Sequence, residues 1–165
     1  YGLGAISGKS ETLFAPNDSI TREELCKIVS AAFSLTADSD INELPFADVD
    51  RASWYGSYIL ICYQNKVING ISSDSFGVGN TVTREEIAAI LVRAAEAAGK
   101  TLDYDITIFP FEDNDEISDW ARESVSVLRE CLIIDGVGDG YFAPRMSVTR
   151  AEAAKMIAGV LNFSY

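Results

Sequence analysis

Three arginines occur in the same short motif and could bind an anion. The motif is Thr-Arg-x-Glu, and it places Arg22, Arg84 and Arg150 at the first position of three predicted helices. The positive end of a helix dipole disfavours a cation there by up to about 1 kcal/mol. The arginines therefore need another role. They either pair with nearby carboxylates in structural bridges or bind an anionic ligand beside backbone N–H groups.

The Thr and Glu of the same motif have a structural explanation. A Thr at the N-cap with a Glu three residues later forms a capping box, which stabilises the start of a helix by about 1 kcal/mol. The pairs are Thr21 with Glu24, Thr83 with Glu86 and Thr149 with Glu152. These residues need no further function, so the interest of the motif lies in its arginine.

The two tryptophans, Trp54 and Trp120, could bind sugar. The face of an indole ring stacks on the apolar side of a sugar, but the same ring also fills a helical core, and the sequence leaves both roles open.

Acidic residues offer no convincing catalytic or metal site. Carboxylate pairs could serve a glycosidase, but at helix starts they complement the dipole, which favours a structural role. These pairs are Asp48 with Asp50 and Asp113 with Asp115. The loop acids Asp74, Asp135 and Asp139 lack the spacing of a calcium loop. We expect no catalytic residue, no metal and no cofactor.

Composition narrows the partners further. With 13 Lys and Arg against 25 Asp and Glu, the net charge is −12, which disfavours nucleic acid and anionic membranes. The chain has no His, and its three cysteines form no CxxC pair, so buried free thiols are expected. No apolar run approaches the roughly 20 residues that span a bilayer. The absence of a signal sequence before Tyr1 says nothing about secretion.

The arginine motifs belong to an internal repeat. A Phe lies seven residues before each motif Thr, and an Ile-x-Gly turn ends six residues before that Phe. The phenylalanines are Phe14, Phe76 and Phe142, and the glycines are Gly8, Gly70 and Gly136. The period is 62 and then 66 residues. We expect repeats at 1–38, 44–100 and 109–165, forming one compact module.

Each repeat is predicted to be helix, loop, helix, which makes the protein all-α. Apolar spacing predicts first helices over Arg51–Lys66 and Ile117–Cys131 and second helices that begin at Thr21, Thr83 and Thr149. Brief strand pairing is expected at most around Thr107–Phe109 and at the loop phenylalanines. Counting sixteen residues back from Gly8 passes Tyr1, so the first repeat lacks its Phe-x-Asp and Trp segment.

The combined pattern resembles the S-layer homology domain. In the third repeat it comprises Phe111-Glu112-Asp113, Trp120, Ile134-Asp135-Gly136, Phe142-Ala143-Pro144 and Val148-Thr149-Arg150-Ala151-Glu152. The second repeat differs in having Gly77-Val78-Gly79 where a Pro-bearing turn is usual, and the first repeat matches over its second half. The resemblance covers nearly the whole chain.

The resemblance implies an extracellular module in the cell wall or S-layer of a bacterium. Its three repeats would be in a pseudo-threefold arrangement around a central helical bundle. It would bind secondary cell-wall polysaccharide, often through a pyruvate ketal on an N-acetylmannosamine, in grooves between repeats. The positions that match the family's groove residues are Arg22, Arg84, Arg150, Trp54, Trp120, Asp48, Asp113, Gly8, Gly70 and Gly136.

Two alternatives accompany that implication. The grooves could hold a peptide or a sister subunit, which would make the chain a protein–protein scaffold or an oligomerisation module of a cell-surface assembly. The incomplete first repeat also predicts an incomplete groove. Residues before Tyr1, another segment, or a partner chain by exchange would complete it, so self-association is possible.

Overall fold

The computed structural model describes residues 15–38, 40, 43–102 and 108–163. Gly8 and Phe14 of the first repeat lie outside the described residues. Within them the chain forms α1 (Arg22–Ala32), α2 (Gly56–Gln64), α3 (Arg84–Ala97), α4 (Asp119–Glu130) and α5 (Arg150–Asn162), with a short 3-10 helix, η1 (Asn114–Glu116). Among these residues, pairing between extended segments is limited to four isolated bridges. The all-α prediction is confirmed.

The three predicted second helices begin where the capping boxes place them. In α1, α3 and α5 the Thr side chain accepts a hydrogen bond from the third helical residue, and that residue's Glu accepts one from the Thr backbone. In α5, for example, the Thr149 N–H donates to Glu152 over 2.8 Å. These helix starts follow from local sequence alone.

The two first helices are shorter than the apolar spacing predicts. In place of Arg51–Lys66, α2 begins only at Gly56, because residues 51–55 form tight turns. The Asp50 carboxylate accepts hydrogen bonds from the Ala52 N–H and the Ser53 hydroxyl, both over 2.9 Å. A Cβ at Gly56 would lie 2.6 Å from the carbonyl oxygen of Arg51, so the chain turns too closely there for a larger residue. The predicted Ile117–Cys131 helix is α4 and loses only its ends.

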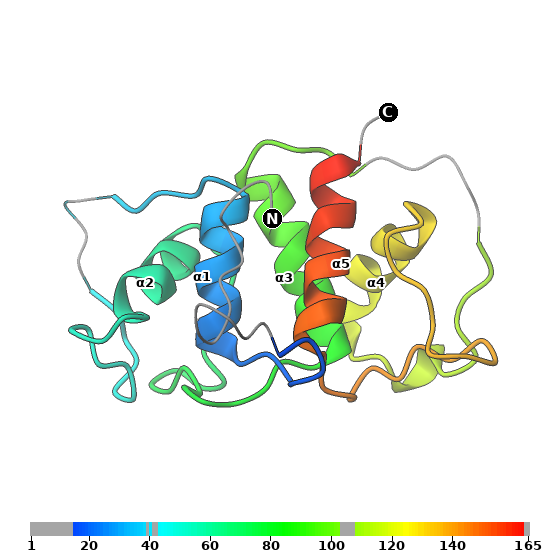
Figure 1. Ribbon diagram of the computed structural model, residues 1–165, viewed down its shortest axis with the longest axis horizontal. Coiled ribbons are helices and arrows are strands. Elements are labelled where there is room, and N and C mark those ends of the chain that lie inside the picture. Colours follow the sequence, from blue (N-terminus) through cyan, green and yellow to red (C-terminus); the bar gives the residue numbers. More distant parts are fainter. Residues whose placement is uncertain (1–14, 39, 41–42, 103–107, 164–165) are drawn as a thin grey trace.

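The second helices form the centre of the molecule, and the first helices flank them. Figure 1 shows α1, α3 and α5 in the middle, with α2 at one side and α4 at the other. The contacts between helices place α2 on α1 and α4 on α3. Each first helix therefore packs on the second helix of the preceding repeat. The two helices that pack together thus come from different sequence repeats. A groove between them can therefore be lined by residues of more than one repeat.

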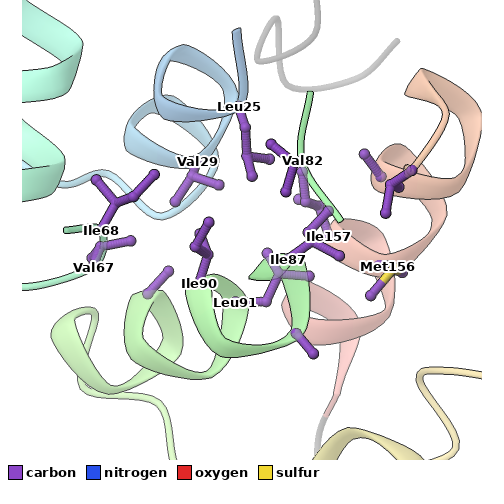
Figure 2. Packing of buried hydrophobic residues seen from close by; sticks show 14 of the residues in the cluster. Leu25, Val29, Val67, Ile68, Val82, Ile87, Ile90, Leu91, Met156 and Ile157 are labelled. Carbon is purple, nitrogen blue, oxygen red and sulfur yellow. The ribbon is translucent and has the colours of Figure 1, made fainter. Parts of the chain in front are cut away.

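Apolar side chains from all of these segments meet in one core. Figure 2 shows α1, α3 and α5 contributing together with the Val67–Ile68 turn and with Val82, which precedes α3. The labelled residues are Leu25, Val29, Val67, Ile68, Val82, Ile87, Ile90, Leu91, Met156 and Ile157. Cys26 and Cys62 are buried in this core as free thiols, and Cys131 is half-buried. Burial raises the pKa of the Cys26 thiol.

A closed ring of backbone hydrogen bonds joins the segments that lead into the central helices. The Ile20 N–H donates to the Val148 carbonyl over 3.0 Å, Val148 donates to Val82 over 2.9 Å, and Val82 donates to Ile20 over 3.0 Å. Three of the isolated bridges lie beside this ring. Brief pairing is expected at most at the loop phenylalanines, and none of the bridges involves Phe76 or Phe142; Thr107 lies outside the described residues.

None of the helices in the described ranges is long and apolar enough to cross a bilayer.

Candidate functional site

The motif arginine of the first repeat reaches across to the second. Arg22 is 4% exposed, and its Nε donates to the Phe76 carbonyl over 2.9 Å. Its Nη2 donates to the Asn69 carbonyl over 2.6 Å, and its Nη1 pairs with Glu86 over 3.0 Å. The guanidinium carbon also lies 4.9 Å from the centre of the Phe76 ring. Arg22 therefore serves first as a bridge that ties the end of one repeat to the loop of the next.

Arg84 makes the same bridge from the second repeat to the third. Its Nε donates to the Phe142 carbonyl over 2.7 Å and its Nη2 to the Asp135 carbonyl over 2.8 Å. Its Nη1 lies 3.5 Å from Glu152, and its guanidinium carbon lies 4.9 Å from the Phe142 ring centre. Burial lowers the pKa of Arg84, and neighbouring carboxylates oppose that shift. The third arginine, Arg150, is 5% exposed and pairs with Glu24 over 3.3 Å.

The aspartates of the Phe-x-Asp motifs hold the loop beneath each arginine. Asp48 accepts hydrogen bonds from the backbone N–H groups of Phe76, Gly77 and Val78 over 2.7, 2.7 and 3.0 Å. Asp113 accepts from the equivalent N–H groups of Phe142 and Ala143 over 2.8 and 2.7 Å. The Gly77-Val78-Gly79 segment thus keeps the contact that the Pro-bearing loop makes. These bonds give both aspartates a structural role.

The turn glycines are required by close packing. A Cβ at Gly70 would lie 2.5 Å from the ring of Phe46 and 2.4 Å from the Ser75 carbonyl oxygen. A Cβ at Gly136 would lie 2.4 Å from the Tyr141 carbonyl oxygen. A larger residue at either position would displace backbone atoms, so steric constraint alone explains the Ile-x-Gly turns.

Both tryptophans lie at the surface. Trp54 is 54% exposed and Trp120 is 52% exposed, so neither is a core residue. Trp54 lies outside α2, with its ring 5.8 Å from the Lys27 ammonium. Trp120 is in the first turn of α4, which packs on α3. Half-exposed indole rings are available to stack on a ligand.

One groove brings predicted site residues from three repeats together. It has a volume of about 250 Å³. Its lining residues are Arg22, Ile68, Asn69, Gly70, Glu86, Ala89, Ile90, Arg93 and Trp120. We call this the Trp120 groove. Its walls are the Arg22 bridge, the Ile68–Gly70 turn, one face of α3, and the indole of α4.

The other predicted site residues do not line this groove. Asp48 and Asp113 hold loops, while Trp54, Arg84, Arg150 and Gly136 lie elsewhere in the described part of the chain, and Gly8 is outside it. Within that part, no group of three or more His, Cys, Asp or Glu side chains could hold a metal ion.

Arg93 of α3 is the groove residue that the sequence analysis missed. It lies nine residues after the motif arginine Arg84 and has no motif of its own. The only clue in the sequence is a basic residue on the same helical face as Glu86, two turns later. Arg93 and Trp120 also line a second, larger hollow of about 820 Å³ between α3 and α4.

Comparison with known proteins shows which family this chain matches. The model of the S-layer homology domain matches residues 1–26, 45–88 and 110–154. The chain is 32% identical over 159 residues to an amylopullulanase of Thermoanaerobacterium thermosulfurigenes, covering 96% of the chain and 8% of that protein. It is 31% identical to an endoglucanase of Bacillus sp. (strain KSM-635), covering 98% of the chain and 17% of that enzyme.

A third relative is an S-layer protein. The chain is 30% identical to the S-layer protein sap of Bacillus anthracis, covering 94% of the chain and 18% of that protein. The chain spans less than a fifth of each of these three relatives. The enzymes therefore match only over a small part of their length, and their catalytic parts are absent from the matched segment. By its three matched segments, the chain belongs to the S-layer homology domain family.

Proposed function

We propose that this chain is a non-catalytic anchoring module that binds secondary cell-wall polysaccharide outside the cell. The pyruvylated sugar of that polysaccharide would occupy the Trp120 groove. The observation that carries the proposal is the convergence of Arg22, Gly70 and Trp120, from three repeats, on one groove. An arginine, a glycine turn and a half-exposed indole together suit a sugar that bears a carboxylate.

The electrostatics of the groove support an anionic ligand. The chain carries a net charge of −12, yet the groove is lined by two arginines and a single carboxylate, Glu86. That carboxylate is already paired with Arg22 over 3.0 Å. Because exposed charges more than about 8 Å away are screened at physiological salt, the local arginines dominate the field at the groove.

The range of relatives also supports an anchoring role. Proteins named as S-layer proteins share this segment with proteins named as an amylopullulanase and an endoglucanase. A segment common to such different proteins suits a task that does not depend on their catalysis. Attachment to the wall is such a task.

The closed backbone ring and the two matching arginine bridges support a pseudo-threefold arrangement of the repeats. We include that arrangement in the proposal. Completion of the first repeat by a second copy of the chain stays a prediction from the sequence, and sedimentation velocity would test it.

Titration calorimetry tests the proposed function. The whole chain would be titrated with purified secondary wall polysaccharide, with and without its pyruvate, and compared with Trp120→Ala. We expect pyruvate-dependent binding that weakens about tenfold in the variant, because a stacked indole contributes on the order of 1 kcal/mol beyond the apolar area that it covers. Phe109→Ala is the matched control, since Phe109 is 88% exposed and does not line the groove.

Two results would contradict the proposal. A folded chain that binds neither glycan is not an anchor of this kind. Equal loss of binding in Trp120→Ala and Phe109→Ala would move the site away from the Trp120 groove.

A further inference from the structure

Arg93 and Arg22 line the same groove but differ in what they already bind. Each of the three guanidinium nitrogens of Arg22 donates to a protein oxygen, and the side chain is 5% exposed. Arg93 is half-buried, and it forms no ion pair with any residue that the structure describes. A guanidinium without a protein partner can present its full fork of donors to a carboxylate. Arg22 has three of its five N–H donors bonded and is almost fully buried, so Arg93 has more donors to offer a ligand.

The charges on either side of Arg93 indicate where an anion would lie. On one side is the Trp120 groove, with Arg22 and Arg93 against the paired carboxylate of Glu86. On the other side is the larger hollow between α3 and α4, where the acids outnumber the two cations, Arg93 and Lys100. Those acids are Glu96, Asp119 and Glu123. A carboxylate is therefore favoured on the groove side of Arg93, beside Trp120.

The other two central helices place their cation differently. The positions nine residues after the motif arginines Arg22 and Arg150 are Ala31 and Gly159, so neither helix has an equivalent of Arg93. One helical turn earlier, α1 has Lys27 and α5 has Lys155, where α3 has Ala89. Lys155 pairs with Asp135 over 3.1 Å. In the second repeat the cation of the central helix thus lies one turn later than in the first and third repeats.

We infer that Arg93 binds the ligand carboxylate in the Trp120 groove, in register with sugar stacking on Trp120, and that it determines the preference for an acidic over a neutral sugar. Arg22 then shapes the groove and contributes charge, while its own bonds hold two repeats together. This inference rests on the proposed function, because it names the residue that recognises the acidic group of that ligand.

The test compares three variants of the whole chain by calorimetry, each against the polysaccharide with and without pyruvate. Arg93→Ala should lose about tenfold or more in affinity for the pyruvylated glycan, because a charged hydrogen-bonded pair is removed. Its affinity for the pyruvate-free glycan should not change. The affinity of Arg93→Lys for the pyruvylated glycan should lie between those of the wild-type chain and Arg93→Ala, because lysine keeps the charge but loses the forked pair of donors.

Lys155→Ala is the matched control. It removes the same charge from the same face of another central helix, in an exposed ion pair. We expect its affinity to change less than about twofold, because exposed pairs contribute little. If Arg93→Ala lowers the melting temperature, Arg93→Gln is used in its place, because glutamine keeps the aliphatic stem of the side chain.

Three results are distinguishable. If the wild-type chain binds neither glycan, the proposed function fails. If the wild-type chain binds the pyruvylated glycan and Arg93→Ala binds it equally well, this inference is overturned while the proposed function stands. Equal losses for both glycans would also overturn it, because Arg93 would then not discriminate the acidic group.

Discussion

The Arg22 and Arg84 bridges are nearly the same structure built twice. Each guanidinium carbon lies 4.9 Å from the centre of a loop Phe ring, and each Nε donates to the carbonyl of that Phe, over 2.9 Å for Arg22 and 2.7 Å for Arg84. Each Nη2 also donates to the carbonyl before a turn glycine. Each loop Phe also packs against the Phe of a Phe-x-Asp motif. The distance between the two ring centres is 5.7 Å in the second repeat and 5.1 Å in the third.

The difference between the two bridges lies outside them. Beside the Arg22 bridge, α3 presents Arg93, and Trp120 closes the groove. Beside the Arg84 bridge, the position of α5 equivalent to Arg93 is Gly159, and Lys155, one turn earlier, is paired with Asp135. The shared motif thus builds the scaffold, and residues without a motif differentiate the surfaces. The predictions below test this division.

The largest expected effect comes from removing a bridge. Arg22→Ala should lower the free energy of unfolding by about 3 kcal/mol or more, because the buried Phe76 carbonyl loses its donor and the Asn69 carbonyl and Glu86 each lose one bond. Arg84→Ala should lose a similar amount. Urea unfolding followed by circular dichroism measures both. Arg93→Ala is the control and should lose less than about 1 kcal/mol; equal losses in all three variants would contradict a scaffold role for the motif arginines.

The turn glycines should give the next largest effect and should separate the two repeats. Gly70→Ala would bring a Cβ within 2.4 to 2.5 Å of three atoms, including the Phe46 ring. Gly136→Ala has one such contact, with the Tyr141 carbonyl oxygen at 2.4 Å, and the Phe111 ring lies 3.4 Å away. We expect losses of about 2 to 3 kcal/mol for Gly70→Ala and about 1 to 2 kcal/mol for Gly136→Ala. The reverse order in urea unfolding would contradict this comparison.

A smaller effect should appear at the residue after each loop Phe, which has a positive φ in all three repeats. The φ angles are 51° at Ala15, 84° at Gly77 and 57° at Ala143. Gly77→Ala should cost about 1 to 2 kcal/mol, because a Cβ is strained there and would lie 2.9 Å from the Asn80 amide nitrogen. Ala143→Gly should raise the free energy of unfolding by less than about 1 kcal/mol. The relief of backbone strain is offset by the larger conformational entropy of Gly in the unfolded chain. Shifts in thermal midpoint with the opposite signs would contradict this.

The smallest expected effect is a pH dependence at Asp48. Partial desolvation raises its pKa, but three backbone N–H bonds outweigh that and hold the pKa below its usual range. The folded pKa is therefore below the unfolded value of about 3.9, so Asp48 stabilises the fold above about pH 4. That contribution is lost as the pH falls through the folded pKa.

Asp48→Asn isolates this pH effect. The difference in unfolding free energy between the wild-type chain and Asp48→Asn should be larger at pH 6 than at pH 3. Asp50, whose pKa is also lowered, chiefly by the Ala52 N–H, is present in both proteins and cancels. A difference that is the same at both pH values would remove Asp48 as a source of acid sensitivity.

Features that depend on neighbouring residues were predictable from the sequence. The capping boxes that start α1, α3 and α5 involve residues three positions apart, so their geometry is local. The overlong prediction for α2 has a local cause as well. Its apolar spacing continues through residues 51–55, but hydrogen bonds to Asp50 and the close turn at Gly56 prevent a helix there.

Features that depend on distant residues were not predictable. The sequence left open whether the motif arginines form bridges or bind ligand, and the acceptors of Arg22 at Asn69 and Phe76 lie 47 and 54 positions away. The surface position of Trp120 depends on α4 packing on the helix of another repeat. The place of Arg93 in the groove follows from the packing of α4 on α3, and no sequence motif marks this residue.

The closed ring of Ile20, Val82 and Val148 has a consequence for a module under mechanical load. In an open solenoid each repeat touches only its neighbours, so tension can peel repeats from one end. Here the segment before the last helix is bonded to the segment before the first as well as to the middle one. Force applied at either end is therefore shared by all three segments of the ring. The central helices should unfold together in one cooperative step.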